Sequence, residues 1–190
     1  MKNLFCILFM VCTISLLVVA CNDNQKKDAS KKEEKSESLE THRSKEDYAE
    51  AIRNFIELLE KEPDNVVLLI SLGNAYFDVG MDPEAIKMYK KALQIYPDNV
   101  SVRTDLGTSY RRSGQTDKAL DEYKKSLAID SRHSITRYNV GVVYLWDKKD
   151  VDQAIKVWEE LLRIDPYFVL ADEIRHNMKT LRRMKAVGMN

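Results

Sequence analysis

Histidines are the side chains in this chain with the broadest catalytic and metal-binding chemistry. His42, His133 and His176 lie in three separate segments, and no two of them share a face of one predicted helix. A zinc site or an acid–base pair needs such side chains to converge. The sequence also contains no Gly-rich phosphate loop and no Gly-x-Ser-x-Gly motif. We therefore expect a protein that is not an enzyme and that needs no metal and no cofactor.

A cysteine directly follows an apolar run near the N-terminus. Lys2 is followed by an apolar run that ends at Ala20, directly before Cys21. The run has about 17 residues, whereas a membrane-spanning helix needs about 20. We therefore predict that residues 1–20 form a signal peptide. Removal of the signal peptide leaves Cys21 as the only cysteine of the mature chain, so we expect no disulfide and no thiolate metal site.

The segment that ends in Val19-Ala20-Cys21 resembles a bacterial lipobox. The resemblance implies that Cys21 is acylated on sulfur, with fatty acids such as palmitate, and becomes the first residue of a membrane-anchored lipoprotein. Two or three acyl chains would hold the protein on a bilayer almost permanently. Asn22 then implies the outer membrane if the source has two membranes. A plain signal peptide or an uncleaved anchor with a nearby cysteine is the alternative.

Residues 21–43 are predicted to form a disordered, charged linker after the lipidated Cys21. Lysine pairs alternate there with Glu and Ser, and Leu39 is the only large apolar residue. Such a segment buries too little surface to fold. The lysines could contact anionic lipid headgroups, but the matching acidic residues favour a solvated linker. The whole chain has 30 Lys+Arg and 30 Asp+Glu, so we expect no nucleic-acid partner.

A repeating pattern of small and aromatic residues organises the rest of the chain. In residues 66–99 it consists of Leu72-Gly73, Tyr76, Ala85, Tyr89, Ala92 and Pro97. The first three share one helical face, and the next three share a face of a second helix. Gly80 suits the residue after the first helix. Asp82 is predicted as the N-cap of the second helix, with Pro83 as its first residue.

The pattern recurs in residues 100–133 and 134–166. In the first of these, Ser126 and Ser131 replace Ala and Pro, which predicts a softer boundary, and Thr116 is a candidate N-cap. In the second, the spacing from Gly to Ala is one residue longer, so we predict an insertion in the Asp147–Asp150 turn. Residues 44–65 match only the second half of the pattern. Residues 167–186 have apolar residues at helical spacing and are predicted to cap the array.

This spacing resembles the tetratricopeptide repeat. The resemblance implies an all-α, helix-turn-helix solenoid over residues 44–186, with three and a half repeats and a C-terminal capping helix. The capping helix ends in several basic residues. They could bind an anionic partner, but cations are also favoured at a helix C-terminus.

In tetratricopeptide proteins the first helices line a concave groove that binds partners. The resemblance implies that Val67 and Ile135 stand at positions that line this groove. Ile70 and Ile135 occupy positions where family members that grip a C-terminal carboxylate have cations, so that mode of recognition is not expected. We predict a groove with apolar ends and a polar, cationic middle. The partner-binding residues that we select are Asn74, Phe77, Thr104, Thr108, Arg111, Tyr138, Val142 and Trp146.

Some of these side chains have a structural alternative. Val142 and Leu145 could be buried against neighbouring helices, and Trp146 could pack under the lengthened turn. The expected function is that of a lipoprotein scaffold or assembly factor in the bacterial cell envelope, with an unknown protein or peptide in the groove. Resembling lipoproteins serve outer-membrane protein insertion, or pilus and secretin assembly. Binding of a lipid or glycan is the alternative from another class.

Overall fold

The computed structural model describes residues 46–187. The predicted signal peptide, Cys21 and the predicted linker all lie outside the described residues. The chain divides into residues 1–49 and 50–190, and the second unit is described here by itself. None of the described helices is long and apolar enough to cross a membrane.

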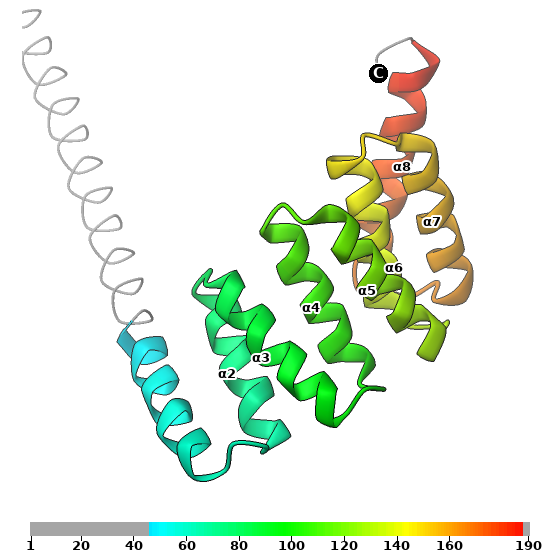
Figure 1. The fold of residues 1–190 in the computed structure, drawn as a ribbon. Coiled ribbons are helices and arrows are strands. Elements are labelled where there is room, and N and C mark those ends of the chain that lie inside the picture. The colour runs from blue at the N-terminus through cyan, green and yellow to red at the C-terminus, as the bar shows by residue number, and fades with distance from the viewer. Residues whose placement is uncertain (1–45, 188–190) are drawn as a thin grey trace, which may run out of the picture. The chain divides into compact units, whose positions relative to one another are not determined.

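Every regular element of the described residues is helical, which confirms the all-α prediction. Residues 46–61 form the first described helix. The others, shown in Figure 1, are α2 (Val66–Asp78), α3 (Asp82–Ile95), α4 (Val100–Arg112), α5 (Thr116–Ile129), α6 (Ser134–Val142), η1 (Val143–Asp147), α7 (Val151–Ile164) and α8 (Ala171–Ala186). The helices pack as the pairs α2–α3, α4–α5 and α6–α7, and each pair contacts the next one along the chain.

A glycine and an aromatic ring bring the two helices of each pair together. A Cβ atom on Gly73 would lie 2.7 Å from Tyr89 Cε1, and one on Gly107 would lie 2.5 Å from Tyr123 Cε1. In the third pair the Trp158 ring would collide with a side chain at the equivalent glycine. The repeated glycine therefore serves close helix packing, because any larger residue would separate the helices.

The turns inside the first two pairs follow the predicted glycines. Gly80 and Gly114 adopt positive φ angles of 81° and 73°, a conformation in which glycine ends a helix without strain. The predicted N-caps Asp82 and Thr116 are wrong, since both are the first helical residues and the caps are Met81 and Gln115. Asp82 instead turns toward the neighbouring pair, where its Oδ2 lies 3.3 Å from the Nε atom of Arg112.

The third pair accommodates its extra residue in a different place from the one predicted. The α6 helix continues as the π-helical turn η1, in which the amide of Lys148 donates to the carbonyl of Val143 at 3.0 Å. A π-turn takes one residue more than an α-turn. The insertion is thus absorbed in the last turn of the first helix. Lys149, with φ 57°, then takes the place of the turn glycine.

Apolar side chains form a core along the helix pairs. Ile52, Phe55 and Leu59, from the helix over residues 46–61, pack on a cluster shared by α2, α3 and α4. At the other end, Ile174 and Met178 of α8 join a buried cluster on α7. That cluster contains Trp158 and Leu161.

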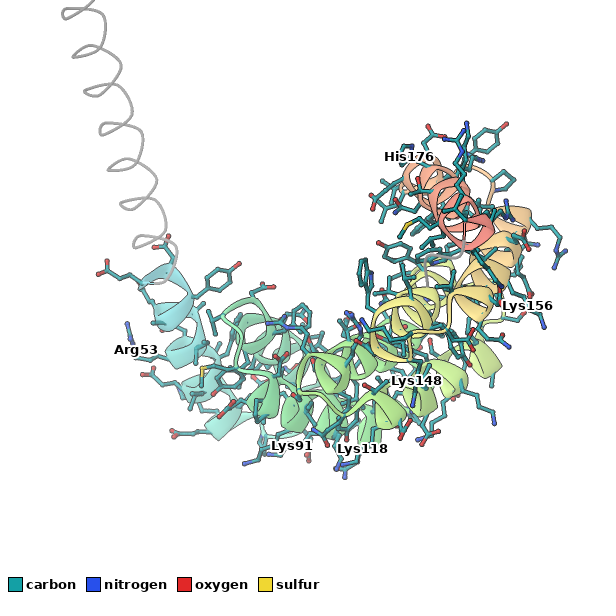
Figure 2. The ribbon with its side chains drawn as sticks, turned by 90° about the horizontal axis from the view of Figure 1, so that it is seen from above. Arg53, Lys91, Lys118, Lys148, Lys156 and His176 are labelled. Atoms are coloured by element: carbon teal, nitrogen blue, oxygen red, sulfur yellow. The ribbon has the colours of Figure 1, made fainter. Side chains whose placement is uncertain are left out.

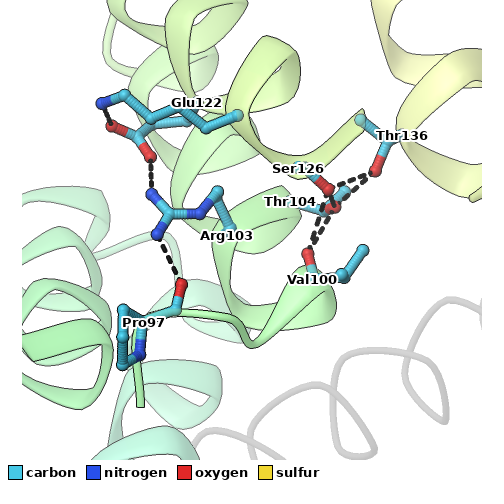
Figure 3. A network of polar contacts seen from close by, with 8 residues as sticks. Pro97, Val100, Arg103, Thr104, Glu122, Ser126 and Thr136 are labelled. Carbon is cyan, nitrogen blue, oxygen red and sulfur yellow. Dashed lines mark hydrogen bonds and ion pairs between the residues drawn. The ribbon is translucent and has the colours of Figure 1, made fainter. Parts of the chain in front are cut away.

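Polar groups join the second pair to the third (Figure 3). The hydroxyl of Ser126 lies 3.0 Å from that of Thr104 and 2.9 Å from that of Thr136, and the last two are 2.6 Å apart. Thr104 also donates to the carbonyl of Val100 at 2.8 Å. The Nδ1 atom of His133 lies 2.7 Å from the Thr136 hydroxyl. This buried hydroxyl cluster ties α4, α5 and α6 together where the expected alanine is replaced by serine.

Candidate functional site

The first helix of each pair contributes to one side of the array. Figure 2 shows Lys91, Lys118 and Lys156, one from each second helix, on the outer side. We call the opposite side, formed by the solvent-facing residues of α2, α4, α6 and η1, the inner face. All of the partner-binding residues selected from the sequence belong to these helices.

Thr104 and Thr108 contribute little accessible surface to the inner face. Thr104 is 2% exposed, and its hydroxyl is consumed by the buried cluster, so its selection as a partner-binding residue is wrong. The hydroxyl of Thr108 lies 3.0 Å from that of Tyr123 and accepts a hydrogen bond from Asn139 Nδ2 at 3.2 Å. Its main contacts are therefore inside the protein.

Tyr138 and Val142 pack against the C-terminal part of the array. The ring of Tyr138 stacks on that of Trp158, with centroids 6.2 Å apart, and lies 5.8 Å from the ring of Phe168. Val142 and Leu145 join the same apolar cluster. The contacts of all three side chains favour a role in packing, which was the alternative for Val142 and Leu145.

The two arginines in the middle of the inner face are both paired with carboxylates of the same chain. Arg111 binds Asp147 with two contacts, Nε to Oδ2 at 2.6 Å and Nη2 to Oδ1 at 3.3 Å. Arg112 lies over the ring of Phe77, 4.2 Å from its centroid, and donates to the Phe77 carbonyl at 3.0 Å. Its ion pair with Asp82 completes its contacts. The predicted cationic middle is therefore wrong, because both charges are matched.

Asn74, Phe77 and Trp146 remain accessible to different extents. Asn74 is exposed, and its Oδ1 accepts a hydrogen bond from the Tyr89 hydroxyl at 2.8 Å. Phe77 is half-buried under Arg112. Trp146 is 60% exposed, with Lys149 Nζ 5.8 Å from its ring centroid. The indole is thus not buried under the turn, which argues against the packing alternative for this residue.

Asp105 is a residue of this face that the sequence reasoning did not select. It stands 34 positions before Asn139, whose side chain donates to Thr108 of the preceding repeat. Asp105 is partly buried, yet within residues 46–187 its carboxylate has no hydrogen bond and no ion pair. Burial raises the pKa of its carboxyl to about 6. The sequence does show that Asp105 occupies, in its repeat, the position that Asn139 occupies in the next one. That its carboxylate has no partner can be seen only in the folded structure.

Two matches to a repeat family cover most of the array. The tetratricopeptide repeat family matches residues 64–132 and again residues 104–167, which together exceed half of the chain. The chain belongs to the tetratricopeptide repeat family. The search among curated proteins gave no match.

Solved tetratricopeptide structures share the fold. A crystal structure of MamA superposes with a TM-score of 0.62 and 25% identity, over 77% of this chain and 93% of that one. A second MamA structure gives a TM-score of 0.61 and 26% identity, over 74% and 80%. The first TPR of Spaghetti (RPAP3), bound to the HSP90 peptide SRMEEVD, gives 0.56 and 23%, over 64% and 93%. The last likeness shows the fold alone.

Metal-binding side chains do not gather in the described part of this tetratricopeptide array. No group of three or more His, Cys, Asp or Glu side chains within residues 46–187 is placed to hold a metal ion. The ring of His133 caps α6, and His176 is exposed on α8. His42 lies outside the described residues.

Proposed function

We propose that this protein is a lipid-anchored scaffold or assembly factor of the bacterial cell envelope, which holds a protein partner on the inner face of its repeats. The proposal combines two features. The predicted acyl chains on Cys21 supply the anchor, and the tetratricopeptide array supplies the surface. A chain of this fold, the first TPR of Spaghetti (RPAP3), holds a peptide, so a peptide segment of the partner is a suitable occupant.

The observation that carries the proposal is the exposure of large apolar side chains on the inner face. Val67 is 71% exposed and Ile135 is 54% exposed, both at the second position of their repeats. Trp146 adds an exposed aromatic ring. Aromatic and apolar anchors of this kind dominate the binding energy of protein interfaces. In this proposal Val67, Ile135 and Trp146 are the apolar contacts that the inner face offers to the partner.

The alternative of lipid or glycan binding through the basic end of α8 is less well supported. Lys185 is paired with Asp152 and Arg182 with Glu159, both across to α7. Arg175 is paired with Asp172 at 2.8 Å. These carboxylates offset the charge that an anionic headgroup would need.

Site-specific photo-crosslinking in membranes tests which side of the array binds the partner. A photoreactive residue in place of Val67 or Trp146 on the inner face should give discrete crosslinked products. Lys91 and Lys118 on the outer side are the matched positions, and they should give few products or none. Equal crosslinking from both sides would contradict the inner face as the working surface.

A further inference from the structure

On the first helices of the pairs, the arginines are all paired with carboxylates, but two aspartates are not paired with cations. Every arginine of α2, α4, α6 and η1 faces a carboxylate within 4 Å: Arg103 with Glu122, Arg111 with Asp147, Arg112 with Asp82 and Arg137 with Glu160. The carboxylates of Asp78 and Asp105, on the same helices, have no hydrogen bond and no ion pair within residues 46–187. The inner face therefore presents uncompensated negative charge.

Both free carboxylates lie near the junction of the first two full repeats. Asp78 is at the end of α2, and Asp105 is in the middle of α4. Each is close enough to the Tyr89 hydroxyl to raise the pKa of that group, after the larger effect of burial. Tyr123 of α5 also faces Asp105. The Tyr89 hydroxyl already donates to Asn74, so it does not satisfy either carboxylate.

The next junction shows what a satisfied version of this position looks like. There Asn139 donates to Thr108, which in turn lies 3.0 Å from the Tyr123 hydroxyl. Asp105 replaces the amide by a group that only accepts hydrogen bonds when ionised. A partly buried carboxylate without a donor is unfavourable by itself, and a cation placed beside it removes that cost.

We propose that the junction of α2 and α4 binds a lysine or arginine side chain of the partner protein, with Asp105 as its principal acceptor and Asp78 as the second carboxylate. This inference rests on the proposed function and names the chemistry of the partner. The peptide segment of the partner must present this cation toward the inner face. Beside the cation it must carry apolar side chains that contact Val67 or Trp146. The chosen occupant is a separate protein, since the chain's own residues 22–43 contain equal numbers of basic and acidic side chains.

Retention of fixed-centre peptide libraries on the full-length chain tests the inference. The probes are short, N-acetylated and C-amidated peptides of neutral residues, with a central Lys, Arg, norleucine or Glu. The Lys and Arg libraries should be retained about tenfold better than the norleucine library, because a charge-assisted hydrogen bond is gained. Asp105→Asn should abolish this preference. Asp121→Asn removes an exposed carboxylate from α5 and should leave the preference intact.

The remaining outcomes separate the inference from the function on which it rests. Equal retention of the Lys, Arg and norleucine libraries would overturn the cation site while leaving peptide binding in place. Failure of every library to bind would count against the inner face as a peptide-binding surface. Replacement of Lys26, Lys27, Lys31, Lys32 and Lys35 by Ala should change nothing. A gain in retention would show that the chain's own lysines occupy the site, which would overturn the assignment to a partner.

Discussion

The guanidinium group of Arg111 binds the carboxylate of Asp147, a residue 36 positions later in the chain, through two contacts of 2.6 Å and 3.3 Å. The pair connects α4 to the π-helical turn η1 and thus spans two repeats. The pair also neutralises Arg111, the cation among the residues that we selected from the sequence as partner-binding.

The first prediction concerns this ion pair. Both side chains are about one quarter exposed, with 27% and 24% of their surfaces accessible. The double-mutant cycle of Arg111→Ala and Asp147→Ala, measured by urea unfolding, should therefore give a coupling energy of only about 0.5–1 kcal/mol. Asp147→Ala should also free the guanidinium and weaken retention of the Lys-centred library. A coupling energy above about 2 kcal/mol would show a structural role far larger than this geometry supports.

The second prediction separates packing from binding at two aromatic residues. Tyr138 stacks with Trp158 and Phe168, so Tyr138→Ala should cost about 2–3 kcal/mol of stability. Trp146→Ala should leave the melting temperature within about 3 °C of the parent, because the indole is exposed. It should, however, reduce capture of the partner in membrane crosslinking. The reverse pattern, with a stable Tyr138→Ala and an unstable Trp146→Ala, would contradict these roles.

The third prediction follows from the raised pKa of Asp105. A carboxyl whose pKa is about 6 in the folded protein and near 3.8 in the unfolded chain favours folding when it is protonated. That contribution is present below the unfolded pKa and is lost as the pH rises through about 6. Asp105→Asn should therefore gain stability relative to the parent between about pH 4 and pH 7.

The size of this effect follows from the same pKa difference. It is of the order of 3 kcal/mol at most, and less where water reaches the carboxyl. Chemical unfolding of both proteins at each pH measures it, with Asp121→Asn as the exposed control. A stability difference between Asp105→Asn and the parent that does not change with pH would contradict the assignment.

The fourth prediction concerns the buried hydroxyl cluster of Thr104, Ser126 and Thr136. Thr104→Val should cost about 1–3 kcal/mol, since the hydroxyls of Ser126 and Thr136 each lose one hydrogen-bond partner. Replacement of all three hydroxyls, by Thr104→Val, Ser126→Ala and Thr136→Val together, should cost less than the sum of the single changes, because each single change removes contacts that the others share. Thermal unfolding of the single and triple variants checks this, and strict additivity would exclude a cooperative cluster.

The fifth prediction tests the anchor. Cys21→Ser should prevent incorporation of labelled fatty acid and should release the protein from the membrane fraction or leave it as an uncleaved precursor. The physical reason is that the thiol is the proposed acylation site, so the variant would carry no acyl chain to hold it on the bilayer. Cys12→Ser, within the predicted signal peptide, is the matched control and should be lipidated normally. Labelled Cys21→Ser protein would show that the lipobox resemblance is misleading.

The repeat architecture was predictable because its signals are local. Leu72, Gly73 and Tyr76 fall on one helical face within a single turn and a half, and Gly80 follows at the distance of a helix end. Each of these signals involves residues that are close together along the chain. They can therefore be recognised in the sequence without knowledge of the fold. The residues selected as partner-binding all lie on the first helices of the pairs, as the spacing predicted.

Only the tertiary structure decided which side chains on those helices are free to bind. Thr104 is buried because Ser126 and Thr136, 22 and 32 residues away, meet its hydroxyl. Arg111 is matched by Asp147 of the π-helical turn, 36 residues later. Within residues 46–187 the carboxylate of Asp105 has no hydrogen bond and no ion pair. Repeat spacing is a property of one helix pair, whereas the pairing of charges and hydroxyls depends on how successive pairs stack.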